Sequence, residues 1–202
     1  MDELAKAVQE KFERVWDPEG EGRYRHGSPG QRLAPRFAPY APAGAIVNEY
    51  GSGTGRAVVA LHKLRPDLKI NMIDIAANAL EQQATDLLSA DITFRLGCLW
   101  DLPPDFPRAD WGYCIDVLMC VPPEKLSTIL PGIRRTCRNL FLQVYDWEDC
   151  RLGINYTTIT EGPDWWEGQL AAVWPSVERL KSEEHARRYI FICGDQQGAR
   201  HG

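Results

Sequence analysis

The chain has 202 residues, a length that suits one sizeable domain able to bury a core without disulfides or metals. Hydrophobic residues make up 44% and charged residues 25%, which is ordinary for a globular protein and argues against a disordered or fibrous chain. The net charge of -5, from 23 basic and 28 acidic residues, gives no overall reason to bind nucleic acid or an anionic membrane. A small or neutral substrate is therefore expected.

Six cysteines stand at positions 98, 114, 120, 137, 150 and 193, with no C-x-x-C pair and no histidines spaced as zinc ligands beside them. Several lie in apolar runs, where a thiol packs as a small hydrophobic group. The N-terminal residues are charged throughout, unlike a secretory signal, and no run of about 18 apolar residues occurs. We therefore expect a reduced, cytoplasmic protein with no metal and no membrane-spanning segment.

An amphipathic helix is predicted over residues 2–16. Apolar side chains recur there every four residues, at Leu4, Val8, Phe12 and Trp16. We expect this stripe to pack on the main domain.

Residues 17–44 are rich in proline, glycine and arginine, which predicts an irregular segment with one short turn around residues 30–37. A segment of this length without its own elements is either disordered or a functional lid, and its aromatic and arginine side chains favour the lid. The expected organisation is one domain overall, with a helix and lid over residues 1–44 and the main domain over residues 45–202.

Strand-like and helix-like runs alternate from residue 45 onward. Predicted strands cover residues 45–50, 69–75, 92–96, 110–116 and 139–145. Predicted helices cover residues 55–65, 76–89, 122–137 and 163–174, with Pro131 expected to kink or divide the third of them. A hairpin is predicted over residues 177–194. This order predicts an α/β fold, an open and mostly parallel sheet with helices on both faces and an antiparallel hairpin at the C-terminal end.

A glycine-rich turn follows the first predicted strand, in the sequence IVNEYGSGTG (residues 46–55). In open α/β sheets ligands bind beyond the carboxyl ends of the strands, near the point where strand order reverses. Gly51 and Gly53 would let the backbone turn sharply and approach a ligand closely. The dinucleotide fingerprint spaces its glycines differently, as G-x-G-x-x-G.

Two carboxylates narrow the ligand class. Asp74 ends the second predicted strand, where a carboxylate can accept hydrogen bonds from both hydroxyls of a ribose. Glu49 stands two residues before the glycines, where its charge would repel a bound pyrophosphate. That position disfavours NAD, FAD and ATP, and with them a nicotinamide-dependent oxidoreductase. A ligand with a ribose, a cationic centre and no phosphate suits both acids, and S-adenosylmethionine is such a ligand.

The sequence here resembles the class I S-adenosylmethionine-dependent methyltransferases, which have a Rossmann-like fold. The run VNEYGSGTG (residues 47–55) is similar to the first motif of the family, and Asp74 matches its second-strand acid. The run DWGYCIDVLMCVP (residues 110–122) is similar to the family's fourth-strand pattern, with Cys120 where histidine is common. The resemblance covers residues 45–146 well and the final hairpin loosely.

The resemblance implies a donor site in which Gly51 and Gly53 lie against the methionine part and the ribose, and Asp74 holds the ribose hydroxyls. It places Glu49 at the methionyl amino end and Leu99 beside the adenine. Many members have an acid near the adenine, whereas this chain has Cys98, so either Asp101 reaches over or the neighbouring side chains hold the ring by packing. The expected donor-binding residues are Glu49, Gly51, Ser52, Gly53, Asp74, Ile75, Cys98, Leu99, Trp100, Asp116 and Val117.

Methyl transfer needs a general base only if the acceptor must lose a proton. The candidate catalytic residues are His26 in the lid, Asp116, and Tyr145 and Asp146 at the end of the fifth predicted strand, with His185 of the final turn as a further candidate base. A solvated loop histidine is the simpler interpretation of His26 and His185. Cys120 is better explained by packing than as a nucleophile.

Two segments could form the acceptor pocket. Arginines of the lid, with Tyr24 and Arg25 among the candidate residues, could bind a carboxylate or phosphate. Trp165 and Trp166 open a predicted helix, where paired tryptophans are typical packing anchors, although one could stack on a planar or cationic acceptor.

The leading hypothesis is a methyltransferase that acts on a small molecule and releases S-adenosylhomocysteine, as a monomer or homodimer. One alternative is a nucleic-acid or protein methyltransferase that uses the arginine-rich lid. The (Asn/Asp/Ser)-Pro-Pro-(Tyr/Phe) motif of amino-methylating DNA enzymes is absent after the fourth predicted strand, which disfavours nucleic acid without excluding it. Another alternative is a subunit that binds S-adenosylmethionine without catalysis.

Overall fold

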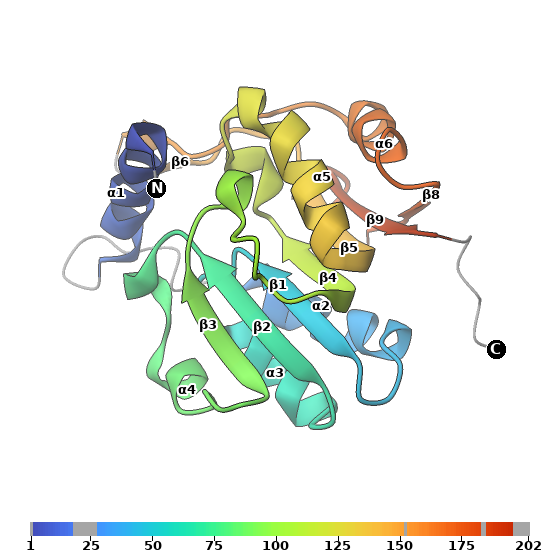
Figure 1. Cartoon of the computed structure of the whole chain (residues 1–202). Helices are drawn as coiled ribbons and strands as arrows, with labels where there is room; N and C mark the ends of the chain where they lie inside the picture. Colours follow the sequence, from blue (N-terminus) through green and yellow to red (C-terminus); the bar gives the residue numbers. More distant parts are fainter. Residues whose placement is uncertain (1, 18–27, 152, 183–184, 196–202) are drawn as a thin grey trace.

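The structure is a computed structural model that describes residues 2–17, 28–151, 153–182 and 185–195. A seven-stranded sheet runs through it in the order β3-β2-β1-β4-β5-β9-β8 (Figure 1). Its strands are β1 (Ile46–Tyr50), β2 (Lys69–Asp74), β3 (Ile92–Leu96), β4 (Ala109–Ile115), β5 (Cys137–Tyr145), β8 (Ser176–Leu180) and β9 (Arg188–Gly194). The first five strands pair in parallel, and β9 pairs antiparallel with both β5 and β8. The predicted α/β fold with a final antiparallel hairpin is thereby confirmed.

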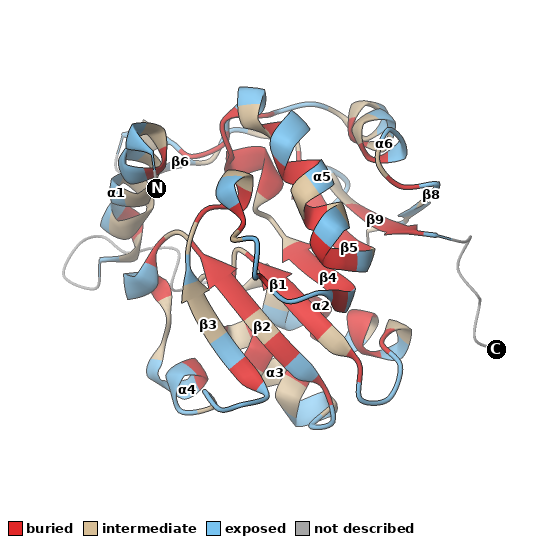
Figure 2. Cartoon of the chain, viewed as in Figure 1, coloured by how far each residue is buried: buried red, intermediate tan, exposed pale blue. Residues whose placement is uncertain are grey.

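Helices cover both faces of the sheet (Figure 1). On one face, α2 (Pro29–Phe37) and α3 (Arg56–Leu64) pack over a core that includes Val47, Met72 and Phe141. On the other face, α5 (Leu126–Thr136) and α6 (Pro163–Ala171) pack over a second core, which includes Leu118, Leu142 and Trp166. Burial is continuous along the central strands (Figure 2). This two-sided packing removes most of the sheet's apolar surface from water.

The strand order reverses beside β1, because β2 and β3 lie on one side of it and β4 and β5 on the other. The register sets Glu49 of β1 opposite Met72 of β2 and Tyr113 of β4. Crevices open at such points in α/β sheets, outside the carboxyl ends of the strands. The glycine-rich turn after β1 and Asp74 at the end of β2 lie there.

The helix predicted over residues 76–89 is wrong in extent, because the chain forms two short pieces, η3 (Ala77–Ala79) and α4 (Gln82–Thr85). Leu80 between them is extended, with ψ of 124°. The Glu81 N–H donates to the Thr54 carbonyl at 3.1 Å, and the Glu81 carboxylate binds the Arg56 guanidinium at 2.7 Å. These bonds hold the segment against the glycine-rich turn, and the chain therefore does not form one continuous helix there.

The predicted N-terminal helix is confirmed as α1 (Glu3–Trp16), which the Asp2 carboxylate caps by accepting from the Ala5 N–H at 2.8 Å. Figure 1 shows α1 standing beyond the end of the sheet rather than on its faces. Residues 28–40 are more regular than predicted, since α2 begins after the Ser28 cap and runs into η2 (Ala38–Tyr40). Proline at the first turn of α2 suits a helix start, because that N–H has no intrahelical partner.

Smaller differences concern the second half of the chain. Helix α5 runs through Pro131 without dividing, and α6 ends at Ala171, before the predicted end. A small hairpin was not predicted and consists of β6 (Cys150–Arg151) and β7 (Ile154–Asn155). Within the described ranges, no helix has the length and apolar character needed to cross a bilayer.

Candidate active site

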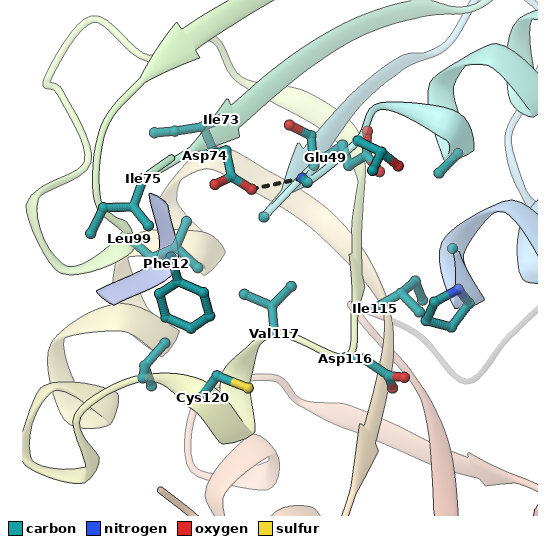
Figure 3. A pocket seen from close by; sticks show the side chains of 18 of the residues that line it. Phe12, Glu49, Ile73, Asp74, Ile75, Leu99, Ile115, Asp116, Val117 and Cys120 are labelled. Carbon is teal, nitrogen blue, oxygen red and sulfur yellow. Dashed lines mark hydrogen bonds between the residues drawn. The ribbon is translucent and has the colours of Figure 1, made fainter. Parts of the chain in front are cut away.

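A cavity of about 330 Å³ lies at the carboxyl ends of β1, β2 and β4. Its walls come from the glycine-rich turn, from η4 (Leu99–Asp101), from α1 and from the start of α2. Side chains near the ends of β5 and β9 complete it. Figure 3 shows Glu49 and Asp74 at one end, Cys120 and Asp116 at the other, and Phe12 and Val117 between them.

The glycine-rich turn is tight and packed. Gly51 has a φ of 76° and Gly53 a φ of 51°, in the left-handed region that favours glycine. The N–H groups of Gly51 and Ser52 both donate to the Ile73 carbonyl, at 2.8 and 3.3 Å. A Cβ on Gly51 would lie 2.4 Å from Cγ2 of Val117. The absence of a side chain thus allows the turn to approach the loop after β4.

Asp74 connects the end of β2 to this turn. One carboxylate oxygen accepts from the Gly53 N–H at 2.7 Å (Figure 3), and the other accepts from the Ala76 N–H at 2.9 Å. Burial raises the pKa of Asp74, opposed by these backbone donors. Each oxygen has a second lone pair, so the carboxylate can still accept hydrogen bonds from a ligand in the cavity.

Glu49 is 4% exposed, and its Oε2 has no hydrogen-bond partner among the described residues. Burial, and then the nearby charge of Asp74, raise the pKa of Glu49 well above the ordinary carboxyl value. Two further buried atoms of the cavity wall, Ser52 Oγ and Trp100 Nε1, also lack a partner within the described residues. Buried polar atoms are almost always hydrogen-bonded in native proteins, so this group indicates a polar ligand.

Cys98, Leu99 and Trp100 line the part of the cavity that the resemblance assigns to adenine. Asp101, the alternative contact considered there, is exposed and is not among the lining residues. The packing alternative for an adenine ring is therefore the one that this geometry favours.

Helix α1 forms a roof over the cavity through Val8, Phe12 and Trp16. The Trp16 ring would lie 3.4 Å from a Cβ built on Gly53. Polar contacts hold the helix in place: the Asn78 side-chain amide donates to the Glu13 carbonyl, and the Lys11 ammonium donates to the Asn155 carbonyl, both at 2.8 Å.

Asp116 lies at the far end of the cavity with a φ of 57°. Its Oδ1 accepts from the Gln143 side-chain amide at 3.0 Å, and its Oδ2 pairs with Arg188 Nη2 at 3.0 Å. The Arg188 guanidinium also lies over the Trp147 ring, 5.4 Å from its centroid. Trp147 stacks in turn on Tyr145, with ring centroids 4.2 Å apart.

Residues 47–139 match a family model described as a methyltransferase domain. This segment contains the glycine-rich turn, Glu49, Asp74 and Asp116, which supply much of the cavity wall. Over residues 47–139 the chain therefore contains a methyltransferase domain.

Solved structures share the fold of this methyltransferase at low sequence identity. The structure described as the DhpI–SAH complex is 16% identical, with a TM-score of 0.71 over 97% of this chain and 100% of that chain. The N-terminal domain of EvdMO1 with SAH bound is 16% identical, with a TM-score of 0.66 over 97% of this chain and 98% of that chain. The mitomycin 7-O-methyltransferase MmcR is 16% identical, with a TM-score of 0.66 over 88% of this chain and 58% of that chain. No curated protein matches the methyltransferase in sequence.

All eleven residues predicted to bind the donor line this one cavity of the methyltransferase. Of the predicted catalytic residues, Asp116 and Tyr145 line it as well. Asp116 is neutralised by Arg188, and burial raises the pKa of the Tyr145 phenol, so neither is a ready proton acceptor. Their catalytic role stays a prediction.

The structure places other predicted residues away from the cavity. The Asp146 carboxylate turns to the Arg187 guanidinium, at 2.6 Å, and to the Tyr189 hydroxyl, and it is not part of the cavity wall. Trp166 is fully buried in the core under α6, with Trp165 packed edge-on against it, and neither lines the cavity. The packing interpretation of the paired tryptophans is the one that the structure supports. Three candidates lie outside the described residues, namely Tyr24, Arg25 and His26.

Several lining residues were missed from sequence. The apolar stripe of α1 was expected to pack on the main domain but was not recognised as a cavity wall, because a 3.6-residue period shows that a face is buried and not what covers it. Arg188, Trp147 and Asp149 lie in the last third of the chain, without a motif that marks them. Arg32 of α2 also lines the cavity.

Proposed function

We propose that this methyltransferase transfers a methyl group from S-adenosylmethionine to a small-molecule acceptor and releases S-adenosylhomocysteine. The observation that carries the proposal is the pair of buried carboxylates, Glu49 and Asp74, that line one end of a single cavity beside the glycine-rich turn. When bound, S-adenosylmethionine supplies a methyl group activated as a sulfonium.

The residues at that end suit the parts of the donor. Asp74 would accept hydrogen bonds from the ribose hydroxyls, and the unpartnered oxygen of Glu49 would accept from the α-ammonium group. Leu99 and Trp100 would pack against the adenine. Phe12 and Trp16 of α1 would cover the donor and exclude water, which strengthens the electrostatic contacts beneath them.

A small acceptor is supported by the concave, largely apolar cavity and by related folds. MmcR is described as a mitomycin 7-O-methyltransferase, and the N-terminal domain of EvdMO1 as a crystal structure in the presence of SAH and D-fucose. We also propose that residues 1–44 form a helix and a lid segment on the main domain, because side chains of α1 and α2 line the cavity. A cytoplasmic location is our proposal too, supported by free cysteines, among them the buried Cys114 and Cys193.

Calorimetry with S-adenosylmethionine, followed by assays for S-adenosylhomocysteine with small molecules, DNA, RNA and peptides, tests the proposal. We expect donor binding and turnover with small molecules. Turnover with a polynucleotide, together with binding that falls steeply with salt, would instead support the nucleic-acid alternative. Donor binding without turnover on any acceptor class would identify a non-catalytic subunit.

A further inference from the structure

We propose that the acceptor is a small organic acid, that Arg188 binds its ionised carboxylate, and that the carboxylate oxygen is the atom methylated. The product would be a methyl ester. This inference rests on the proposed function and specifies the substrate class of the same cavity.

The position of Arg188 is the first observation. It lines the cavity together with Asp116, Cys120 and Tyr145, at the end away from Glu49 and Asp74. Figure 3 shows Asp116 and Cys120 separated from those two acids by Phe12 and Val117. The two acids proposed to contact the ribose and the ammonium group of the donor therefore lie at one end, and the Arg188 guanidinium lies at the other end, beside Asp116.

The guanidinium is held in a defined orientation. Arg188 opens β9 and pairs in register with Tyr145, the last residue of β5. Asp116 bonds it at 3.0 Å, and the Trp147 ring lies beneath it. A planar fork of N–H donors with a fixed orientation matches the geometry of a carboxylate. Because Asp116 shares the positive charge, an acceptor carboxylate would be oriented while keeping much of its nucleophilicity.

The surroundings of Arg188 offer no good base. Burial raises the pKa of the Cys120 thiol to about 12 and also raises that of the Tyr145 phenol, so both groups are protonated near neutral pH. Asp116 is ion-paired, and carboxylates such as Asp116 and Asp149 are weak bases toward an alcohol or phenol. No histidine is among the described residues that line the cavity. An acceptor that arrives already ionised does not need a base.

Much of the remaining wall is apolar and aromatic, and includes Val8, Phe12, Val121 and Trp147. It suits the hydrocarbon or aromatic body of an organic acid, while Arg188 holds the acidic end. Charged residues of that wall include Arg32 and Asp149, which carry opposite charges.

The step balances without proton transfer. A carboxylate oxygen forms the new bond to the methyl carbon, the carbon–sulfur bond breaks, and its electron pair remains on the sulfur. One negative and one positive charge are neutralised together. The ester no longer carries the charge that pairs with Arg188, which favours its release.

The test uses the full chain with S-adenosylmethionine and two sets of acceptors. The acids are benzoate, phenylacetate and cinnamate, and the neutral analogues are phenol, benzyl alcohol and benzylamine. Release of S-adenosylhomocysteine and formation of base-labile methyl esters are measured, and phenylacetate binding to the protein loaded with S-adenosylhomocysteine is measured by NMR. We expect esters from at least one acid and a rate that stays level between about pH 6 and pH 9, because the carboxylate is ionised throughout.

Arg188→Met should raise the KM for the acid, or the Kd of phenylacetate, by about tenfold to about a hundredfold through loss of a charged hydrogen-bond donor. Arg188→Lys should recover part of this loss, because it keeps the charge but not the fork. Arg187→Met is the matched control: Arg187 precedes Arg188 and pairs with Asp146 outside the cavity, and we expect wild-type values for it.

Three results would overturn the inference. They are faster turnover of the neutral acceptors than of every acid, equal acid binding by wild type and Arg188→Met, and neither binding nor methylation of any of the acids. Faster methylation of phenol or benzylamine than of every acid would leave the proposed function intact while rejecting the acid acceptor. Failure of the wild-type protein to bind S-adenosylmethionine would reject the proposed function, and this inference with it.

Discussion

The glycines and acids of the first motif contribute in different ways. A side chain at position 51 would collide with Val117, so packing requires glycine there. The Gly53 N–H instead donates a hydrogen bond to the Asp74 carboxylate. Glu49 keeps an oxygen without a partner among the described residues. Packing therefore explains one glycine, whereas the two acids are explained best by a ligand.

Asp74→Asn should weaken S-adenosylmethionine binding by about tenfold to about a hundredfold, because an amide replaces one of the two acceptor oxygens and loses the charge. Asp74→Ala should lose at least as much affinity. Calorimetry measures both, with Asp105→Asn as the control, since Asp105 pairs with Arg95 on the surface. Unchanged affinity in both Asp74 variants would reject the assignment of a ribose to this carboxylate.

Glu49→Gln should change the stability of the protein and its affinity for the donor in opposite directions. The pKa of Glu49 is raised in the folded protein, so the folded state holds this proton more tightly than the unfolded state. The contribution of the group to the free energy of unfolding is therefore greatest at low pH and falls as pH rises from the ordinary carboxyl value toward the raised one. Removing the ionisable group should stabilise the donor-free protein above that range and weaken donor binding by about tenfold.

Urea unfolding across a pH series and calorimetry with the donor measure the two effects of Glu49→Gln. Glu124→Gln, on an exposed position before α5, is the control for a generic change of charge. A variant that binds the donor as the wild type does would contradict the proposed contact with the ammonium group.

At the scale of elements, α1 is part of the site and also packs on the core, since Phe12 lines the cavity and lies against the core cluster under α5 and α6. Its apolar stripe faces the cavity, and polar bonds from Asn78 and Lys11 tie the helix to neighbouring segments. Exposed polar bonds such as these are typical of elements that open locally.

Trp16→Ala should remove the ring that lies against Gly53 and leave one wall of the donor site open to water. We expect dissociation of S-adenosylmethionine to be about tenfold faster, with the sheet intact by circular dichroism. Leu4→Ala is the matched control, since Leu4 belongs to the same stripe but does not line the cavity. Equal dissociation rates in the two variants would show that α1 does not act as a roof.

At the scale of the whole molecule, each core on the two faces of the sheet supplies some residues of the cavity wall and many that do not line it. Trp166 of α6 is one of the latter, because it is fully buried and does not line the cavity. Its ring fills the core between α6 and the β5–β9 side of the sheet.

Trp166→Ala should lower the free energy of unfolding by about 3–5 kcal/mol through lost burial and a new cavity. Donor affinity should be unchanged at temperatures where the variant is folded. Denaturant unfolding measures the free energy of unfolding, and calorimetry measures the donor affinity. Trp165→Ala, at a half-buried position, is the comparison, and we expect a smaller loss of stability for it. A large loss of affinity in folded Trp166→Ala would place this tryptophan in the binding machinery.

Local chemistry made much of the molecule predictable. The strands follow from apolar runs, and the donor end of the site follows from Glu49, the glycines and Asp74, because each sits at the end of a strand that its own sequence defines. Strand ends of a parallel sheet meet at one edge, so residues of separate motifs come together without knowledge of detailed packing.

Contacts between distant segments decided the rest. The helix predicted over residues 76–89 is broken because Thr54 and Arg56 bind Glu81, and the α1 stripe covers a cavity that no helical period reveals. The Asp116–Arg188 pair joins the loop after β4 to the start of β9, which become neighbours only once the antiparallel hairpin adds to β5. Such pairings depend on strand order and register across the chain, and these are set by burial of both sheet faces together.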